Sequence, residues 1–279
     1  MIERIKRKAR ARRLHTAQSL AARMQRMPDG SLVFVRFNRG QRIQHQILIA
    51  SFTTLAITGL LQRYSHLFLI GVVINGVFGG IETLRTIHHL AALVFILEAI
   101  YHLWEIVMIF FVNRDSVAMF PGPQDFSDLL QMIKFNLNRA KERPAFDRFS
   151  IEEKLEYWAL LWGGAVMILT GFIQWFPTLI TKILPGYAIP VSRAIHSWEA
   201  VLATLAILTW HLYHTAIKER NQTIFTGYMT EIEMQEKHLI EYQRILGAHA
   251  YLQKILGEEQ QIAPESIHEE GQHEVVEGG

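Results

Sequence analysis

The sequence predicts an all-α integral membrane protein, built as a four-helix bundle with extra helices on the cytoplasmic side. Three observations support this fold class. Half of the 279 residues are hydrophobic, which is more than a soluble chain of this size usually carries. They gather in four blocks, each about as long as the roughly 20 residues that cross a hydrocarbon core. Lys and Arg gather in alternate connections. The expected spans, within a transmembrane domain of residues 41–218, are 43–62, 86–112, 155–176 and 194–217.

The segment before the first span, residues 1–40, is strongly basic. Residues 1–42 contain twelve Lys and Arg. Residues 3–27 have the pattern of a basic amphipathic helix, and the turn-forming Pro28 to Gly30 follows it. Contact with acidic lipid headgroups explains such a flank in a membrane protein. We therefore expect a surface helix and no nucleic-acid partner.

The distribution of Lys and Arg predicts the orientation of the chain. The connection between spans two and three contains seven of them, whereas the first and third connections contain only four together. Positively charged connections stay in the cytoplasm. Both termini and the middle connection are therefore expected to be cytoplasmic.

The composition of three other segments outside the spans predicts their secondary structure. Residues 66–82 are apolar but short and interrupted by glycine, so we expect an interfacial or external helix and no fifth crossing. A cytoplasmic helix is predicted over residues 219–257. Residues 258–279 are acidic and lack Lys and Arg, which predicts a disordered tail.

The chain contains no cysteine. This excludes structural disulfides, thiolate ligands to iron–sulfur clusters and covalent haem attachment through Cys-x-x-Cys-His within the chain. Any bound metal must therefore have nitrogen, oxygen or thioether ligands.

Histidines inside the spans are the strongest functional signal, because ionisable groups are costly to bury in a membrane. His88 and His102 lie within about 40° of one face of span two, about 21 Å apart along the axis. His196 and His211 lie within about 60° of one face of span four, about 22 Å apart. Spans two and four are parallel, so His88 and His196 lie near the outer face. His102, His211 and His45 of span one lie near the cytoplasmic face.

Histidines that face each other across a bundle at two depths match bis-imidazole ligation of two haems. Zinc would need three or four ligands at one depth, and a proton relay or a bridge between helices is the alternative for any single histidine. His214, one turn beyond the inner group, would allow a third haem. The expected outer pair is His88 with His196, and the inner pair is His211 with His45 or His102.

Two glycines in the spans also fit this interpretation. Gly59 and Gly171 each follow a threonine and provide smooth surfaces that a flat macrocycle or another helix can approach closely.

Four stretches of the sequence resemble the spans of the formate dehydrogenase gamma-subunit family. Its relatives include the cytochrome b subunits of nickel–iron hydrogenases and thiosulfate reductases. The likeness covers residues 37–242 and includes the later "KHLIEY". The stretches are "QRIQHQILIASFTTLAITG", "LRTIHHLAALVFIL", "EKLEYWALLWGGAVMILTGFIQWF" and "IHSWEAVLATLAILTWHLYH".

The resemblance implies a subunit of a respiratory oxidoreductase in a bacterial-type inner (plasma) membrane. It implies two b-type haems, and a quinone, menaquinone or ubiquinone, that exchanges electrons near the cytoplasmic haem. An iron–sulfur or multihaem cytochrome c subunit would dock on the outer face. The chain itself has no catalytic domain, so the enzyme would be the complex.

The family pairs a first-span histidine, three residues after an arginine, with the later histidine of span four. Those positions are Arg42, His45 and His211 here, and the second pair matches the outer pair above. The chain departs from the family in two ways. It has the extra His102, and the spacing in span four is 15 where the family has 14. Both features resemble the cytochrome b of quinol–cytochrome c reductase complexes, so His45 and His102 remain alternatives.

Quinone reduction takes up two protons, so acid–base groups near the haems are candidates for the quinone and proton chemistry. Carboxylates near a ligand imidazole can also fix its tautomer, and a hydrogen bond to a neighbouring helix is the simpler explanation for each. The candidates are Glu98, Glu105, Glu199 and Tyr213.

Three other functions compete with this interpretation. A cytochrome b core of a quinol-oxidising complex would use His102 as a ligand, but the chain lacks the Pro-Glu-Trp-Tyr signature of quinol oxidation. A ferric-reductase-like carrier would need a nucleotide-binding glycine motif, which does not follow the last span. A transporter or scaffold with proton-carrying histidines would contain no haem.

Overall fold

The computed structural model describes residues 1–113 and 118–269, which form two compact units. One unit comprises residues 1–36, 131–148 and the chain from 228 onward, and is here called the peripheral unit. The other comprises residues 37–130 and 149–227, and is here called the helical unit.

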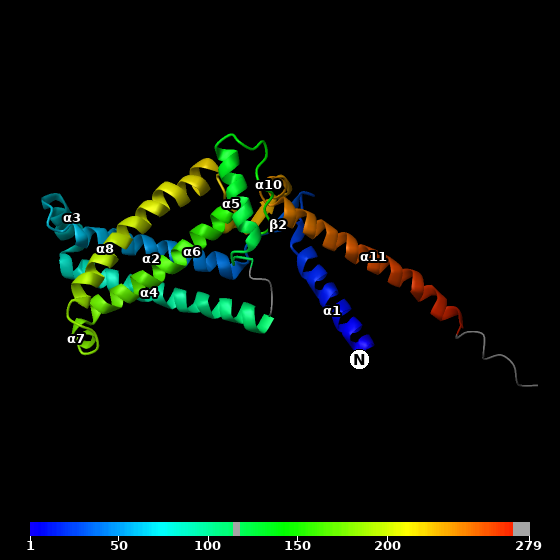
Figure 1. Cartoon of the computed structure of the whole chain (residues 1–279), viewed down its shortest axis with the longest axis horizontal. Helices are drawn as coiled ribbons and strands as arrows, with labels where there is room; N and C mark the ends of the chain where they lie inside the picture. Colours follow the sequence, from blue (N-terminus) through cyan, green and yellow to red (C-terminus); the bar gives the residue numbers. More distant parts are fainter. Residues whose placement is uncertain (114–117, 270–279) are drawn as a thin grey trace, which may run out of the picture. The chain divides into compact units, whose positions relative to one another are not determined.

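Four long helices make up the helical unit (Figure 1). Within the described residues, these four are long and apolar enough to cross a membrane, over 39–63, 81–111, 151–175 and 188–218, which confirms the predicted fold class. Two of them continue into π-helical turns, η1 (Met108–Asn113) after α4, and η2 (Ile207–His211) and η3 (Tyr213–Lys218) after α8. The helices are α2 (Arg39–Arg63), α4 (Ile81–Val107), α6 (Ile151–Trp175) and α8 (Ala188–Ala206).

The four helices begin four to six residues before the predicted spans, and at α2 and α6 polar residues cap the first turn. At α2, the side chain of Asn38 accepts from the N–H of Gln41, and the side chain of Gln41 accepts from the N–H of Asn38. Ser150 and Glu153 form the same reciprocal pair at α6. Such capping boxes satisfy N–H groups that lack partners within the helix.

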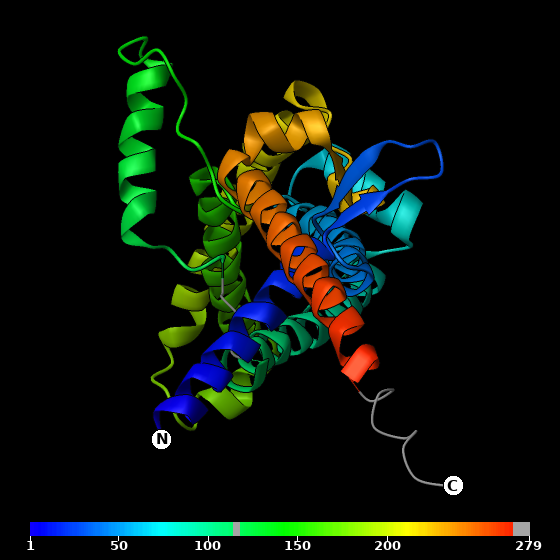
Figure 2. The same ribbon diagram turned by 90° about the vertical axis from the view of Figure 1, so that its right-hand side faces the viewer.

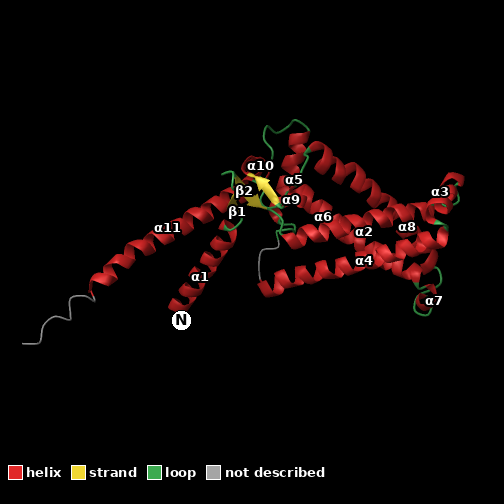
Figure 3. Ribbon diagram, turned by 180° about the vertical axis from the view of Figure 1, so that it is seen from behind, coloured by secondary structure: helices red, strands yellow, loops and turns green. Residues whose placement is uncertain are grey.

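The four helices pack as neighbouring pairs. α4 packs against α2, α8 packs against α6, and α2 also contacts α8 (Figures 1 and 3). The large apolar side chains of these helices point outward, as Leu97, Leu169 and Leu202 show, while Thr58 and Thr170 are buried. Apolar groups outside and hydroxyls inside suit a bundle that has lipid around it.

Shorter helices connect the spans. α3 (Phe68–Phe78) has 11 residues, too few to cross a membrane, as the glycine pattern predicted. It ends at Gly79 and Gly80, which have φ angles of 72° and 126° that favour glycine. The remaining short helices are α5 (Pro123–Asn136), which continues into the peripheral unit, α7 (Pro177–Ile180) and α9 (Thr223–Thr226).

The peripheral unit combines helices with a small antiparallel sheet in the order β1-β2-β3 (Figure 2). Phe34 of β2 pairs with Met229 of β3, and together with Met234 and Ile245 they form a buried apolar cluster. The elements are α1 (Ile2–Ala21) packed on α11 (Leu239–Glu269), β1 (Met24–Arg26), β2 (Leu32–Val35), β3 (Tyr228–Thr230) and α10 (Glu231–Lys237).

A buried carboxylate joins three segments of the peripheral unit. Glu241 of α11 accepts hydrogen bonds from Arg23 and Arg148, each at 2.8 Å, and from Arg36. Burial by itself raises the pKa of Glu241, but Arg36 and Arg148 outweigh it and hold that pKa below its usual range. Burial, with Arg36 adding to it, lowers the pKa of the neighbouring His238 to about 4. The cluster therefore contains a charged Glu241 and a neutral His238 at pH 7.

The single helix predicted over residues 219–257 is wrong, since this segment is divided. Gly227, with a φ of 88°, ends α9, and β3 follows it. The capping box of Thr230 and Glu233 then starts α10, and a break at His238 separates α10 from α11. α11 continues to Glu269, so the first part of the predicted disordered tail is helical, and residues 270–279 lie outside the described residues.

Candidate functional site

The first feature inside the helical unit is a facing pair of imidazoles, here called the His88 pair. His88 comes from α4 and His196 from α8, and their ring centres are 6.5 Å apart with the ring planes at 69°. The structure therefore brings together the two histidines that the sequence predicted to lie at the outer depth.

Threonines on the other two helices fix the tautomer of the His88 pair. The hydroxyl of Thr58 lies 2.8 Å from Nδ1 of His88 and donates its proton to the carbonyl oxygen of Thr54, at 2.6 Å. Thr170 lies 2.9 Å from Nδ1 of His196 and donates in the same way one turn back. A hydroxyl has one proton, so its oxygen accepts from Nδ1–H. The Nε2 lone pair of each histidine is left for a metal.

Glycines next to these threonines make room for the rings. A Cβ on Gly59 would lie 3.2 Å from Cε1 of His88, and a Cβ on Gly171 would lie 3.2 Å from Cε1 of His196. The two Thr–Gly pairs occur in the similar stretches "ITGLLQ" and "LTGFIQ". The pairs α2–α4 and α6–α8 are thus an internal repeat around the His88 pair.

A second facing pair, here called the His45 pair, lies further along the same helices. His45 of α2 and His211 at the end of η2 have ring centres 6.3 Å apart and ring planes at 47°. Nδ1 of His211 lies 2.7 Å from a carboxylate oxygen of Glu156 on α6. Within the described chain, the buried Nδ1 of His45 has no partner.

The two levels are well separated. Thr58, at the level of the His88 pair, lies 13 residues from His45 along α2, which corresponds to about 20 Å. This agrees with the separation that the histidine spacings predicted.

The π-helical turn η2 explains the unusual spacing in the last span. The N–H of Leu212 bonds to the carbonyl oxygen of Ile207, five residues back. A π turn takes up one residue more than an α-helical turn. The 15 residues from His196 to His211 therefore place the two rings as 14 residues of regular helix would. The spacing is no longer a reason to prefer the quinol–cytochrome c reductase pattern.

The geometry of both pairs fits two ligands of one iron. An imidazole nitrogen lies about 2 Å from a metal that it binds and the ring centre about 1.2 Å further, so two opposed ligand rings have centres roughly 6.4 Å apart. The observed distances are 6.5 and 6.3 Å. Among the described residues, no three His, Asp or Glu side chains converge on one point, as a structural zinc site would require.

Arg42 supplies a cation beside the His45 pair. It lies one turn before His45, and its buried Nε has no hydrogen-bond partner within the part of the chain that the structure describes. Its side chain passes close to Gly227, where a Cβ would lie 3.3 Å from Nη1 of Arg42 and 3.0 Å from the carbonyl oxygen of Phe37. A guanidinium group with a buried Nε that lacks a partner suits a carboxylate ligand, such as a haem propionate.

His102 lies in a different environment from the two pairs. Its Nε2 is 3.0 Å from the hydroxyl of Tyr157, and its Nδ1 is 3.1 Å from Oε1 of Gln44. Gln44 also donates to Glu105 at 2.8 Å. Both ring nitrogens of His102 are thus engaged by side chains. Of the two alternatives for the partner of His211, the structure places the ring of His45 beside it.

The other sequence candidates are more scattered. Glu199 lies against α6, with an oxygen 2.7 Å from where a Cβ of Gly163 would be. Glu98 is half-buried and makes no hydrogen bond within the described residues. Tyr213 is exposed and packs edge-on against His214, which also contacts the ring of Trp210. His214 therefore faces aromatic side chains.

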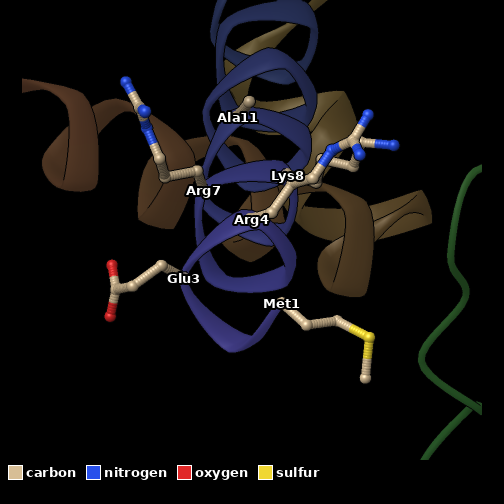
Figure 4. A pocket seen from close by; sticks show the side chains of 6 residues that line it. All are labelled: Met1, Glu3, Arg4, Arg7, Lys8 and Ala11. Carbon is tan, nitrogen blue, oxygen red and sulfur yellow. The ribbon is translucent and has the colours of Figure 1, made fainter.

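A depression in the peripheral unit has a different chemistry. Arg4 and Lys8 project from one side of α1 and Arg7 from the other (Figure 4). This surface holds no histidine and lies on the basic helix that the sequence predicted. That helix ends at Ala21, earlier than the predicted residue 27, because Met24–Arg26 form β1. Its lining residues are Met1, Glu3, Arg4, Arg7, Lys8 and Ala11.

Several residues of the site were not found from the sequence. They are polar side chains within the spans that orient the histidines: Thr58, Thr170, Gln44, Glu156 and Tyr157. Thr58 and Thr170 had a usable signal, because each precedes a glycine in the repeated stretch. Glu156 and Tyr157 lie near the start of their span, where polar residues are common and carry no signal.

Facing imidazoles at two levels between four spanning helices define the class of membrane b-type cytochromes. The comparison with known families agrees with this class.

The family model for prokaryotic cytochrome b561 matches residues 36–227, more than half of the chain, and the chain therefore belongs to this family. This confirms the resemblance to the b-type cytochrome subunits of hydrogenases and formate dehydrogenases. The chain is thus a multi-pass membrane electron carrier of a family that binds b-type haem. No curated protein matches the chain.

Proposed function

We propose that the chain is the di-haem cytochrome b subunit of a respiratory oxidoreductase, and that it carries electrons between the quinone pool and a redox partner subunit. The observation that carries this proposal is the pair of ring-centre distances, 6.5 Å for the His88 pair and 6.3 Å for the His45 pair. Each pair has the separation of two imidazoles that share one iron. Two such pairs correspond to two haems.

The residues of the chain have distinct roles in this proposal. His88 and His196 hold one haem, and Thr58 and Thr170 keep their Nε2 atoms directed toward it. His45 and His211 hold the other, with Glu156 orienting His211. A haem iron with two imidazole ligands gains and loses one electron without a change of ligand.

The orientation of the chain follows from its charges. The connection between spans two and three and the segment before span one are rich in Lys and Arg, which favours a cytoplasmic location for both and for both termini. The His45 pair would then lie near the cytoplasmic face of a bacterial-type inner membrane. The His88 pair would lie near the outer face, where an iron–sulfur or multihaem cytochrome c subunit would dock.

A quinone would exchange electrons at the cytoplasmic level. The hydrogen-bonded series of Glu105, Gln44, His102 and Tyr157 supports this, because it places polar and acid–base side chains beside the His45 pair. Such groups are costly in a membrane and are kept there for function. Glu98, about one turn from His102, is a further candidate for proton transfer.

Haem counting in single variants tests the proposal. The wild-type chain is expected to bind two haems per polypeptide, and alanine at any of the four paired histidines should remove one of them. His102→Ala is the matched control, because it removes an imidazole at the same depth and should keep both haems. Size-exclusion chromatography of each variant separates loss of haem from loss of folding.

Three results would contradict the proposal. A folded wild-type chain without haem absorption would remove its basis. Loss of a haem in His102→Ala but not in His45→Ala would transfer the ligand role to His102 and favour the reductase pattern. Two intact haems in His88→Ala would show that the His88 pair does not hold iron.

A further inference from the structure

The two histidine pairs differ in the groups that bind their Nδ1 atoms. In the His88 pair, both acceptors are neutral hydroxyls, from Thr58 at 2.8 Å and Thr170 at 2.9 Å. In the His45 pair, the acceptor of His211 is the carboxylate of Glu156 at 2.7 Å. The internal repeat is therefore broken at this level by a charged group.

In the part of the chain that the structure describes, Glu156 has no polar partner besides His211. Its one hydrogen bond is the bond to His211, and no Lys or Arg there forms an ion pair with it. Its carboxylate is thus directed at the imidazole and is not offset by an ion pair with Lys or Arg among the described residues. The side chain of Glu156 therefore acts on the ligand imidazole of the His45 pair and on no other group described by the structure.

A carboxylate that accepts from Nδ1–H has two effects on a ligand imidazole. It holds the ring in one orientation with Nε2 free, and it draws the Nδ1 proton away, which makes Nε2 a stronger electron donor. A stronger donor stabilises Fe(III) relative to Fe(II) and lowers the reduction potential. A hydroxyl, which here is itself a donor to a backbone carbonyl, has the same geometric effect and a weaker electronic one.

We propose that Glu156 is a positioning residue that orients His211 and lowers the reduction potential of the haem held by the His45 pair. This inference rests on the proposed function, because it requires a haem at that pair. Since His45 has no Nδ1 partner among the described residues, Glu156 is the group that acts on a ligand Nδ1 atom of this pair. The two haems are then electronically different although their ligands are the same.

The test is a potentiometric titration of the purified full-length chain, followed by haem absorbance at fixed pH, for wild type and Glu156→Gln. Glutamine keeps the shape and an acceptor oxygen but removes the charge. We expect both haems to remain bound and one potential to rise by at least 59 mV, which is a tenfold change in the Fe(III)/Fe(II) equilibrium for one electron. The other potential should stay unchanged.

His45→Ala identifies which potential belongs to which pair, because it should leave only the haem of the His88 pair. Glu105→Gln is the matched control for charge, since Glu105 lies near the same level but bonds to Gln44 and to no ligand imidazole. Its effect on the potential should be clearly smaller. Glu156→Asp, which keeps the carboxylate, should stay closer to wild type than Glu156→Gln.

The inference is overturned if Glu156→Gln keeps both haems and raises neither potential by 59 mV. It is also overturned if only the potential of the His88 pair changes. An equal shift in Glu105→Gln would also overturn it, since charge alone would then explain the result. If Glu156→Gln loses one haem, Glu156→Asp must restore it, and failure to do so contradicts the orienting role. A wild-type chain without haem would instead refute the proposed function.

Discussion

Replacement of Gly171 by alanine tests the packing of the His88 pair. The new Cβ would lie 3.2 Å from Cε1 of His196, whereas carbon atoms in contact prefer about 3.5–4.0 Å. The ring, or the helix that carries it, must therefore move by roughly 0.3–0.8 Å. Metal–ligand distances tolerate only about 0.2 Å. We expect haem binding at this pair to weaken about ten- to a hundredfold, as when groups that orient metal ligands are altered.

The same substitution has an opposite effect on the helix itself. Alanine within a helix is favoured over glycine by roughly 0.5–1 kcal/mol, because glycine loses more backbone entropy on folding. The haem-free Gly171→Ala chain is thus expected to be at least as stable as wild type. Weaker haem binding in a chain that is equally stable would distinguish a ligand effect from general damage.

Haem titration of the purified chain, with the number of haems per polypeptide read from absorbance, measures this effect. Gly59→Ala should behave in the same way, since its Cβ would meet His88 at the same distance of 3.2 Å. Gly76→Ala is the control, because a Cβ at this position in α3 meets nothing within 4 Å. Two haems bound with wild-type affinity in both Gly171→Ala and Gly59→Ala would refute the argument.

Two further predictions concern the peripheral unit. Glu241→Gln leaves three arginines without their buried carboxylate and should lower the stability of the peripheral unit by about 3–5 kcal/mol. Arg244→Gln is the control, because it breaks an exposed ion pair and should cost less than about 1 kcal/mol. The thermal midpoints of the two variants measure the difference. The pKa of His238 is about 4 in the folded chain and near 6.5 in the unfolded chain. Between these values the unfolded chain takes up a proton while the folded chain keeps His238 neutral. The free energy of unfolding therefore decreases as the pH falls from about 6.5 to 4. Thermal midpoints at pH 7 and 5 should show a loss of about 2 kcal/mol, which His238→Asn should largely remove.

The four spans could be predicted from the sequence because hydropathy is a local property and a membrane requires a fixed length of apolar helix. The depth of each histidine followed in the same way, since rise and rotation per residue are constant in an α-helix. These rules grouped His88 with His196, and they placed His45, His102 and His211 at one depth.

The partner of His211 could not be decided by such rules. The choice between His45 and His102 depends on which helices are neighbours, and α2 contacts α8 while His102 is held between Gln44 and Tyr157. The π turn before His211 also lies outside these rules, because it interrupts the regular hydrogen bonding of the helix. Helical arithmetic assumes a regular helix and cannot anticipate such a turn.

The sequence by itself thus determined the class of fold, the four spans and the depth of the histidines, because each depends on residues within one helix. Only the tertiary structure decided that His45 faces His211, and that Thr58, Thr170 and Glu156 hold the Nδ1 atoms of the ligands. The three hydrogen bonds join residues 26 to 55 positions apart on different helices, and His45 and His211 are still further apart in the sequence. No local pattern specifies them, since they exist only once the helices have packed.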